Sequence, residues 1–113
     1  MVIRWVGKGD ILAEVKYGHV VSADDVTRIN QMIRKYVKVA RTYDHLQRLV
    51  RQSMYLVTLS HAPAWANIKN LRAVRSRAIQ EYESTARMAN ERLAKLNRTE
   101  RFDTKYGYGK RYD

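Results

Sequence analysis

The chain has 113 residues, 45% of them hydrophobic, and this size and composition favour one folded domain over a disordered chain. Its 22 Lys and Arg against 11 Asp and Glu leave a formal net charge of +11, which predicts a polyanionic partner, either nucleic acid or an acidic protein surface. The absence of cysteine excludes disulfides and thiolate metal sites. No apolar run approaches the roughly 20 residues that a membrane span needs.

Residues 1–21 are expected to form a short β-hairpin arm. β-branched and aromatic residues occupy 2–6, residues 11–17 alternate in part, and Gly7 and Gly9 between them allow the positive φ of a hairpin loop. A helix that starts at residue 10 is the alternative. A two-stranded ribbon is only marginally stable alone, so the arm must pack on the helices or on another subunit. Arg4 interrupts the first apolar run, which is atypical of a secretory signal peptide. We therefore expect an intracellular protein or one that acts within a virus particle.

The strongest pattern predicts one helix over residues 24–59, roughly 50 Å long at about 1.5 Å per residue. No proline or glycine interrupts it. Ser22 or Asp24 can cap its start, and it should end near Ser60 because Pro63 follows. Apolar residues recur in steps of three, four or seven, as one face of a helix requires. They are Val26, Ile29, Ile33, Tyr36, Ala40, Tyr43, Val50, Met54 and Val57.

A second periodic segment follows Pro63 and predicts another helix over about 64–97. Together the two predict a mainly α fold, a long antiparallel helical hairpin of about residues 24–60 and 64–97. The single domain would then consist of the β-arm (1–21), the hairpin (22–97) and an extended basic tail (98–113). Several apolar residues lie outside the two main faces. Either the β-arm covers them or the hairpin self-associates into a four-helix bundle or larger array. They are Val37, Val39, Leu46, Leu49, Leu56 and Val74.

A basic band is the most informative functional pattern. Between residues 26 and 80 the only acid is Asp44, so most cations there lack the i,i+4 partner of an ordinary mixed helix surface. Arginine predominates, and its planar fork suits phosphate. No base-reading motif is present, so we expect contact with the DNA or RNA backbone. An acidic protein surface and a role in solubility alone are the alternatives. The predicted contacts are Arg34, Lys38, Arg41 and Arg48, which are expected to be exposed, and Lys69, Arg72 and Arg77, which continue the basic band beyond Pro63.

Arg75 stands apart because it falls within the apolar face of the second helix. It either extends to solvent at the edge of the hairpin or pairs inward with Asp44 or with a carboxylate of a partner. From residue 98 onward the periodicity is lost, and tyrosines alternate with basic residues and glycine. We expect this tail to contact a partner or neighbouring subunit, by protein packing or by stacking on bases. Its contact residues would be Arg101, Tyr106, Tyr108, Arg111 and Tyr112.

No catalytic residue, metal site or cofactor is expected. His19, His45 and His61 have no metal-ligand spacing, and residues 7–10 lack the length of a phosphate-binding loop. We therefore expect a non-enzymatic structural protein, a small subunit of a viral particle or other nucleoprotein assembly. It would form a homo-oligomer or join a larger assembly through its apolar helix faces, and would use neither a membrane nor a small-molecule substrate. The alternative is a soluble accessory protein of the nucleoid-associated or mobilisation type, which binds nucleic acid without sequence specificity.

Overall fold

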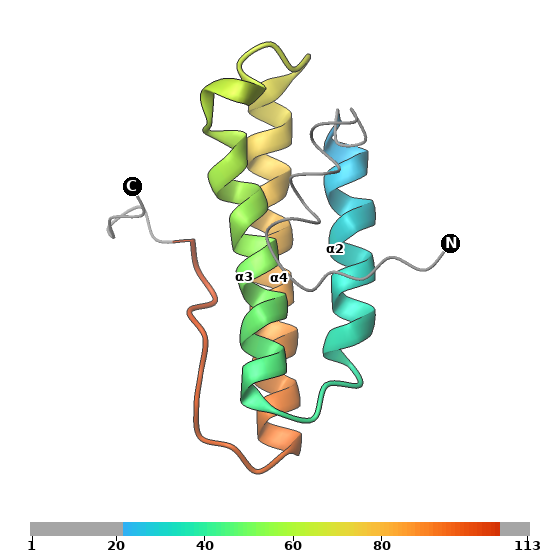
Figure 1. The fold of residues 1–113 in the computed structure, drawn as a ribbon, viewed down its shortest axis with the longest axis vertical. Helices are drawn as coiled ribbons and strands as arrows, with labels where there is room; N and C mark the ends of the chain where they lie inside the picture. Colours follow the sequence, from blue (N-terminus) through green and yellow to red (C-terminus); the bar gives the residue numbers. More distant parts are fainter. Residues whose placement is uncertain (1–21, 107–113) are drawn as a thin grey trace.

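The computed structural model describes residues 22–106, and these residues form three α-helices and no strand. The helices are α2 (Ala23–Val37), α3 (Tyr43–Ser60) and α4 (Leu71–Lys95), with one turn of 3-10 helix, η1 (Pro63–Trp65), between α3 and α4. Consecutive helices run in opposite directions, so α2 and α4 point the same way (Figure 1). The fold is mainly α, as predicted, and none of these helices combines the length and hydrophobicity needed to cross a bilayer. The predicted β-arm lies outside the described residues.

The predicted continuous helix over 24–59 is wrong, because the chain turns at residues 38–42. Thr42 is the N-cap of α3: its Oγ1 accepts a hydrogen bond from the backbone N–H of His45 at 3.1 Å. The apolar periodicity hides this break, since Tyr36, Ala40 and Tyr43 keep a helical spacing on both sides of the turn. The predicted two-helix hairpin is therefore replaced by a three-helix bundle, in which α4 packs on both α2 and α3.

The other helix ends follow local signals more closely. Ser22 caps α2, its Oγ accepting the backbone N–H of Asp25 at 3.2 Å, and α3 ends at Ser60 as predicted. The second predicted helix begins later than expected, at residue 71, because η1 and a turn occupy residues 63–70. Arg75 does not pair with Asp44. Its Nε instead donates to the carbonyl of Ser60 at 2.7 Å, where the end of α3 leaves acceptors unpaired.

The core receives apolar side chains from all three helices and from Trp65, which is fully buried. Because α2 is a separate third helix, it supplies the cover that we expected from the β-arm or from a second copy. Of the six apolar residues that lay outside the predicted faces, only Val39 is exposed, at 65%, and it is the only large apolar side chain so exposed among the described residues. The others are buried: Val37, Leu46, Leu49, Leu56 and Val74.

A polar junction joins the three helices inside this core. Asn30 of α2 is fully buried, and its Oδ1 accepts hydrogen bonds from Ser53 Oγ of α3 at 2.5 Å and from Thr85 Oγ1 of α4 at 3.5 Å. Its Nδ2 donates to the carbonyl of Val26 at 2.9 Å. Buried polar groups are costly without partners, so this junction favours one register of the helices over alternatives that would separate its members.

Candidate nucleic-acid interface

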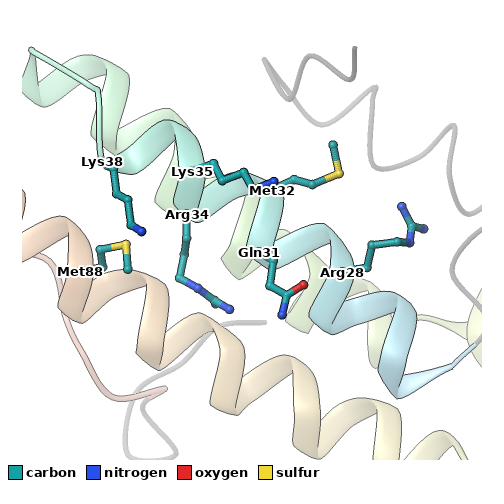
Figure 2. Close-up of a pocket in the computed structure, with 7 residues that line it drawn as sticks. All are labelled: Arg28, Gln31, Met32, Arg34, Lys35, Lys38 and Met88. Carbon is teal, nitrogen blue, oxygen red and sulfur yellow. The ribbon is translucent and has the colours of Figure 1, made fainter. Parts of the chain in front are cut away.

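A shallow groove lies between α2 and α4, and we call it the α2/α4 groove. Its larger part has a volume of about 420 Å³, and it continues past Lys38 and Met88 into a second depression of about 280 Å³. The larger part is lined by Arg28, Gln31, Met32, Arg34, Lys35, Lys38 and Met88, all drawn in Figure 2. The smaller part adds Glu91, Arg92 and Lys95.

Helical spacing places the side chains of α2 in two rows. Gln31, Arg34 and Lys38, three and four residues apart, extend toward α4, whereas Arg28, Met32 and Lys35 extend away from it along the rim (Figure 2). Lys35 and Lys38 are exposed, and neither forms an ion pair among the described residues. Their charges are therefore available to a ligand.

Arg34 is not the exposed contact that we predicted. One guanidinium nitrogen lies 2.7 Å from Glu81 Oε1 and donates to Thr85 Oγ1 at 3.3 Å, and the Arg34 side chain is only 16% exposed. This part of α2 faces α4 and not solvent, so Arg34 forms an ion pair beneath the groove. Because Glu81 compensates its charge, Arg34 contributes little to a positive surface.

The remaining predicted contacts do not form one stripe with Lys38. Arg41 and Arg48 are exposed, but Arg41 lies in the turn at 38–42 and Arg48 lies beyond it on α3. Lys69 and Arg72 are exposed at the opposite end of the bundle, near the start of α4. Arg72 lines a separate depression there, together with His61, Arg75, Ser76, Ile79 and Gln80.

Arg77 has a structural contact instead. It is half-buried, and its Nη1 donates to Thr27 Oγ1 of α2 at 2.6 Å and lies 3.9 Å from the carboxylate of Asp24. It therefore ties α4 to the first turn of α2. Of the seven predicted contacts, only Arg34 and Lys38 line the α2/α4 groove, and only Lys38 is exposed there.

The groove also contains cations that the sequence argument did not include among the contacts. Arg92 and Lys95 lie beyond residue 80, where acidic residues reappear, so they fell outside the basic band. The sequence nonetheless contains a spacing that indicates their position. Met88, Arg92 and Lys95 are spaced by four and three residues, and this spacing places them on one edge of α4. Arg92 is partly engaged, since its Nε donates to the carbonyl of Ala40 at 2.7 Å.

The described part of the tail lies on the protein's own helices. The backbone N–H of Tyr106 donates to Glu83 Oε2 at 3.0 Å, and its ring packs at the edge of the core. Arg101 is exposed, and its Nη1 donates to the carbonyl of Glu100 at 2.9 Å. Residues 98–106 therefore have a surface of their own chain to lie on, and contact of this tail with a partner or neighbouring subunit stays a prediction. Tyr108, Arg111 and Tyr112 lie outside the described residues.

Within residues 22–106, no group of three or more His, Asp or Glu side chains is arranged to hold a metal ion. The groove offers cations and an amide, which suit an anionic ligand, beside the apolar thioethers of Met32 and Met88. Comparison of the chain with protein-family models, with curated proteins and with solved structures gives no match.

Proposed function

We propose that this protein is a non-enzymatic nucleic-acid-binding protein that contacts the sugar–phosphate backbone through the α2/α4 groove. The observation that supports this proposal is the gathering of cations from two helices around one groove, with Glu91 the only acid among the described residues that line it. Lys35, Lys38 and Lys95 are exposed there without an ion-pair partner among the described residues. Binding a polyanion stabilises such unpaired cations more than it stabilises cations that already have an acidic partner.

The expected mode of binding is electrostatic and independent of sequence. Each phosphate that a lysine or arginine neutralises releases condensed counterions, so affinity falls as salt rises. The three exposed groove lysines, Lys35, Lys38 and Lys95, predict a slope of log K against log salt of about −3 on duplex DNA. The exposed cations of the groove that have no ion-pair partner among the described residues are lysines, which act on phosphate as point charges, so different sequences should bind alike.

Two roles can use this activity. The soluble accessory role is favoured, because the bundle buries the apolar residues that we expected to drive assembly and leaves Val39 as the exposed large apolar side chain among the described residues. The second candidate role is that of a subunit of a viral particle or other nucleoprotein assembly. It is supported by the segment 98–106, which docks on an open face of α3 and α4 and could dock equally on another copy. Sedimentation of the protein separates a small soluble species from large salt-resistant oligomers.

The test is fluorescence anisotropy with labelled single-stranded DNA, RNA and duplex DNA at low and moderate salt. The variant K35Q/K38Q removes two groove cations, and R48Q/R51Q removes the same charge from the exposed surface of α3. We expect the groove variant to bind weakly, with a salt slope shallower by roughly two, and the α3 variant to bind nearly as the wild type. Equal losses of affinity in both variants would reject the groove as the binding site. Absence of binding to every probe at low salt would reject the proposed function.

A further inference from the structure

The segment 98–106 is held by side chains that recognise its backbone. The amide of Asn90 on α4 forms a pair of hydrogen bonds with Phe102: Oδ1 accepts the Phe102 N–H at 2.8 Å, and Nδ2 donates to the Phe102 carbonyl at 3.0 Å. The Phe102 ring stacks on Tyr43 of α3, with ring centroids 5.4 Å apart and planes 3° from parallel. One residue of the segment is thus bound through its backbone and its ring together.

Two further contacts continue this recognition along the segment. The Tyr82 hydroxyl donates to the carbonyl of Asp103 at 2.7 Å, and Glu83 Oε2 accepts the N–H of Tyr106 at 3.0 Å. All four hydrogen bonds therefore go to backbone groups of an extended chain, and Phe102 supplies the aromatic anchor. This combination of backbone hydrogen bonds and a side-chain pocket is how proteins bind extended peptides. We call the face formed by Tyr43, Tyr82, Glu83 and Asn90 the α3/α4 peptide surface.

The segment packs at the edge of the helical core. The buried apolar side chains of the described residues all belong to residues 26–93, whereas Phe102 and Tyr106 are half-buried at the edge. The chain reverses at one place, Asn97, which adopts φ 59°. Its N–H donates to the carbonyl of Ala94 at 3.1 Å, and the N–H of residue 98 donates to that of residue 93 at 2.9 Å. This is a Schellman turn, and every contact with the peptide surface lies beyond it.

We propose that the α3/α4 peptide surface also binds the segment 98–106 of a second copy of this chain, so that two molecules exchange their C-terminal segments. The structure indicates this partner because the surface already fits the segment 98–106. The same donors and acceptors would meet between two chains. Exchange adds no new kind of contact; it only replaces the turn at Asn97 by a more open connection. This is the geometry of domain swapping, in which an identical element moves between protomers.

The short connection between α4 and the segment 98–106 determines how often exchange occurs. A short connection gives the chain's own segment an effective concentration on the order of millimolar, so the wild-type protein should be mainly monomeric at micromolar concentration. Opening the turn should remove this advantage without touching the peptide surface. The inference is independent of nucleic-acid binding, and it would provide the contact that a particle subunit needs.

The first test compares N97P with N97G in the full chain. Proline is locked near φ −65° and lacks the N–H that donates to Ala94, so N97P cannot keep the Schellman turn, whereas glycine keeps it easily. In sedimentation equilibrium we expect N97G to remain monomeric and N97P to dimerise, with an apparent dimer dissociation constant lower by roughly 100-fold or more. A folded N97P chain that stays monomeric over the whole concentration range would overturn the inference.

A complementation test identifies the contact. In the N97P background, N90A removes the backbone partner of Phe102, and F102A removes the anchor. Each variant alone should be monomeric. Their mixture should form a heterodimer with one intact junction, the Phe102 segment of one copy on the Asn90 surface of the other. A mixture that stays monomeric while the parent dimerises would reject segment exchange as the contact.

Should N97P fail to fold, as judged by circular dichroism, a labelled peptide of residues 98–106 is added to the wild-type chain. The peptide must compete with the tethered segment, so we expect saturable binding only near millimolar concentration. The F102A peptide should not bind. Equal behaviour of the two peptides would overturn the inference.

Discussion

Replacing Arg34 by glutamine should destabilise the bundle. Its guanidinium lies 2.7 Å from the Glu81 carboxylate, and the two side chains are 16% and 15% exposed. An exposed ion pair contributes about 0–1 kcal/mol, whereas removing one partner of a fully buried pair costs about 3–5 kcal/mol. Because this pair retains some solvent contact, we expect R34Q to lower the free energy of unfolding by about 2 kcal/mol, between those limits.

Thermal and urea unfolding, followed by far-UV circular dichroism, measure this change. A loss of about 2 kcal/mol should lower the Tm by roughly 8–12 °C in a domain of this size. The matched control is R48Q, an exposed arginine on α3, whose effect should stay within about 0.5 kcal/mol. The double variant R34M/E81M should recover much of the loss, because it leaves no charge stranded. If R34Q and R48Q are equally stable, the ion pair contributes nothing and the reasoning is refuted.

Three other outcomes are expected. W65A should cost about 3–5 kcal/mol in urea unfolding, because Trp65 is fully buried, and a loss below about 1 kcal/mol would show that the core closes around the gap. T42A should lower the free energy of unfolding by about 1 kcal/mol because it removes the cap of α3, whereas T42S should retain most of the stabilisation that the cap provides. Equal losses in the two variants would argue against the cap. Hydrogen bonding and charge from Arg98 lower the pKa of Glu100 from 4.5 to about 2. Since the folded pKa lies below the unfolded one, the pair stabilises the fold above about pH 4.5, and this contribution is lost as the pH falls toward 2. Titration of the Glu100 carboxyl by NMR should show the low midpoint in the wild type and a higher one, closer to 4.5, in R98Q, which keeps the backbone hydrogen bond but loses the partner side chain.

Local signals in the sequence correctly predicted a mainly helical chain and the end of α3 near Ser60, and they narrowed the cap of α2 to Ser22 or Asp24, of which the structure has Ser22. Each of these depends on groups within a few residues of one another: a hydroxyl beside free backbone N–H groups, or a proline that restricts the residue before it. The turn at 38–42 was missed although Thr42 is also such a signal. The apolar spacing continued across it, and periodicity alone does not reveal whether the chain stays straight.

The candidate site could be predicted only in part, and Arg34 and Lys38 show why. The same helical spacing puts both on the side of α2 toward α4, but Arg34 meets Glu81 whereas Lys38 reaches solvent. Whether Arg34 is exposed or forms an ion pair depends on a residue 47 positions away in the sequence, brought near by helix packing.

The sequence by itself determined the excess of positive charge, the helical periodicity and the helix ends set by local capping. Only the tertiary structure decided that α2 closes the core as a third helix, that cations from α2 and α4 share one groove, and that residues 98–106 lie on α3 and α4. The physical reason is the distance along the chain over which each interaction acts. Capping and periodicity act between near neighbours, whereas a groove or a docking surface exists only after apolar burial has chosen which helix faces meet.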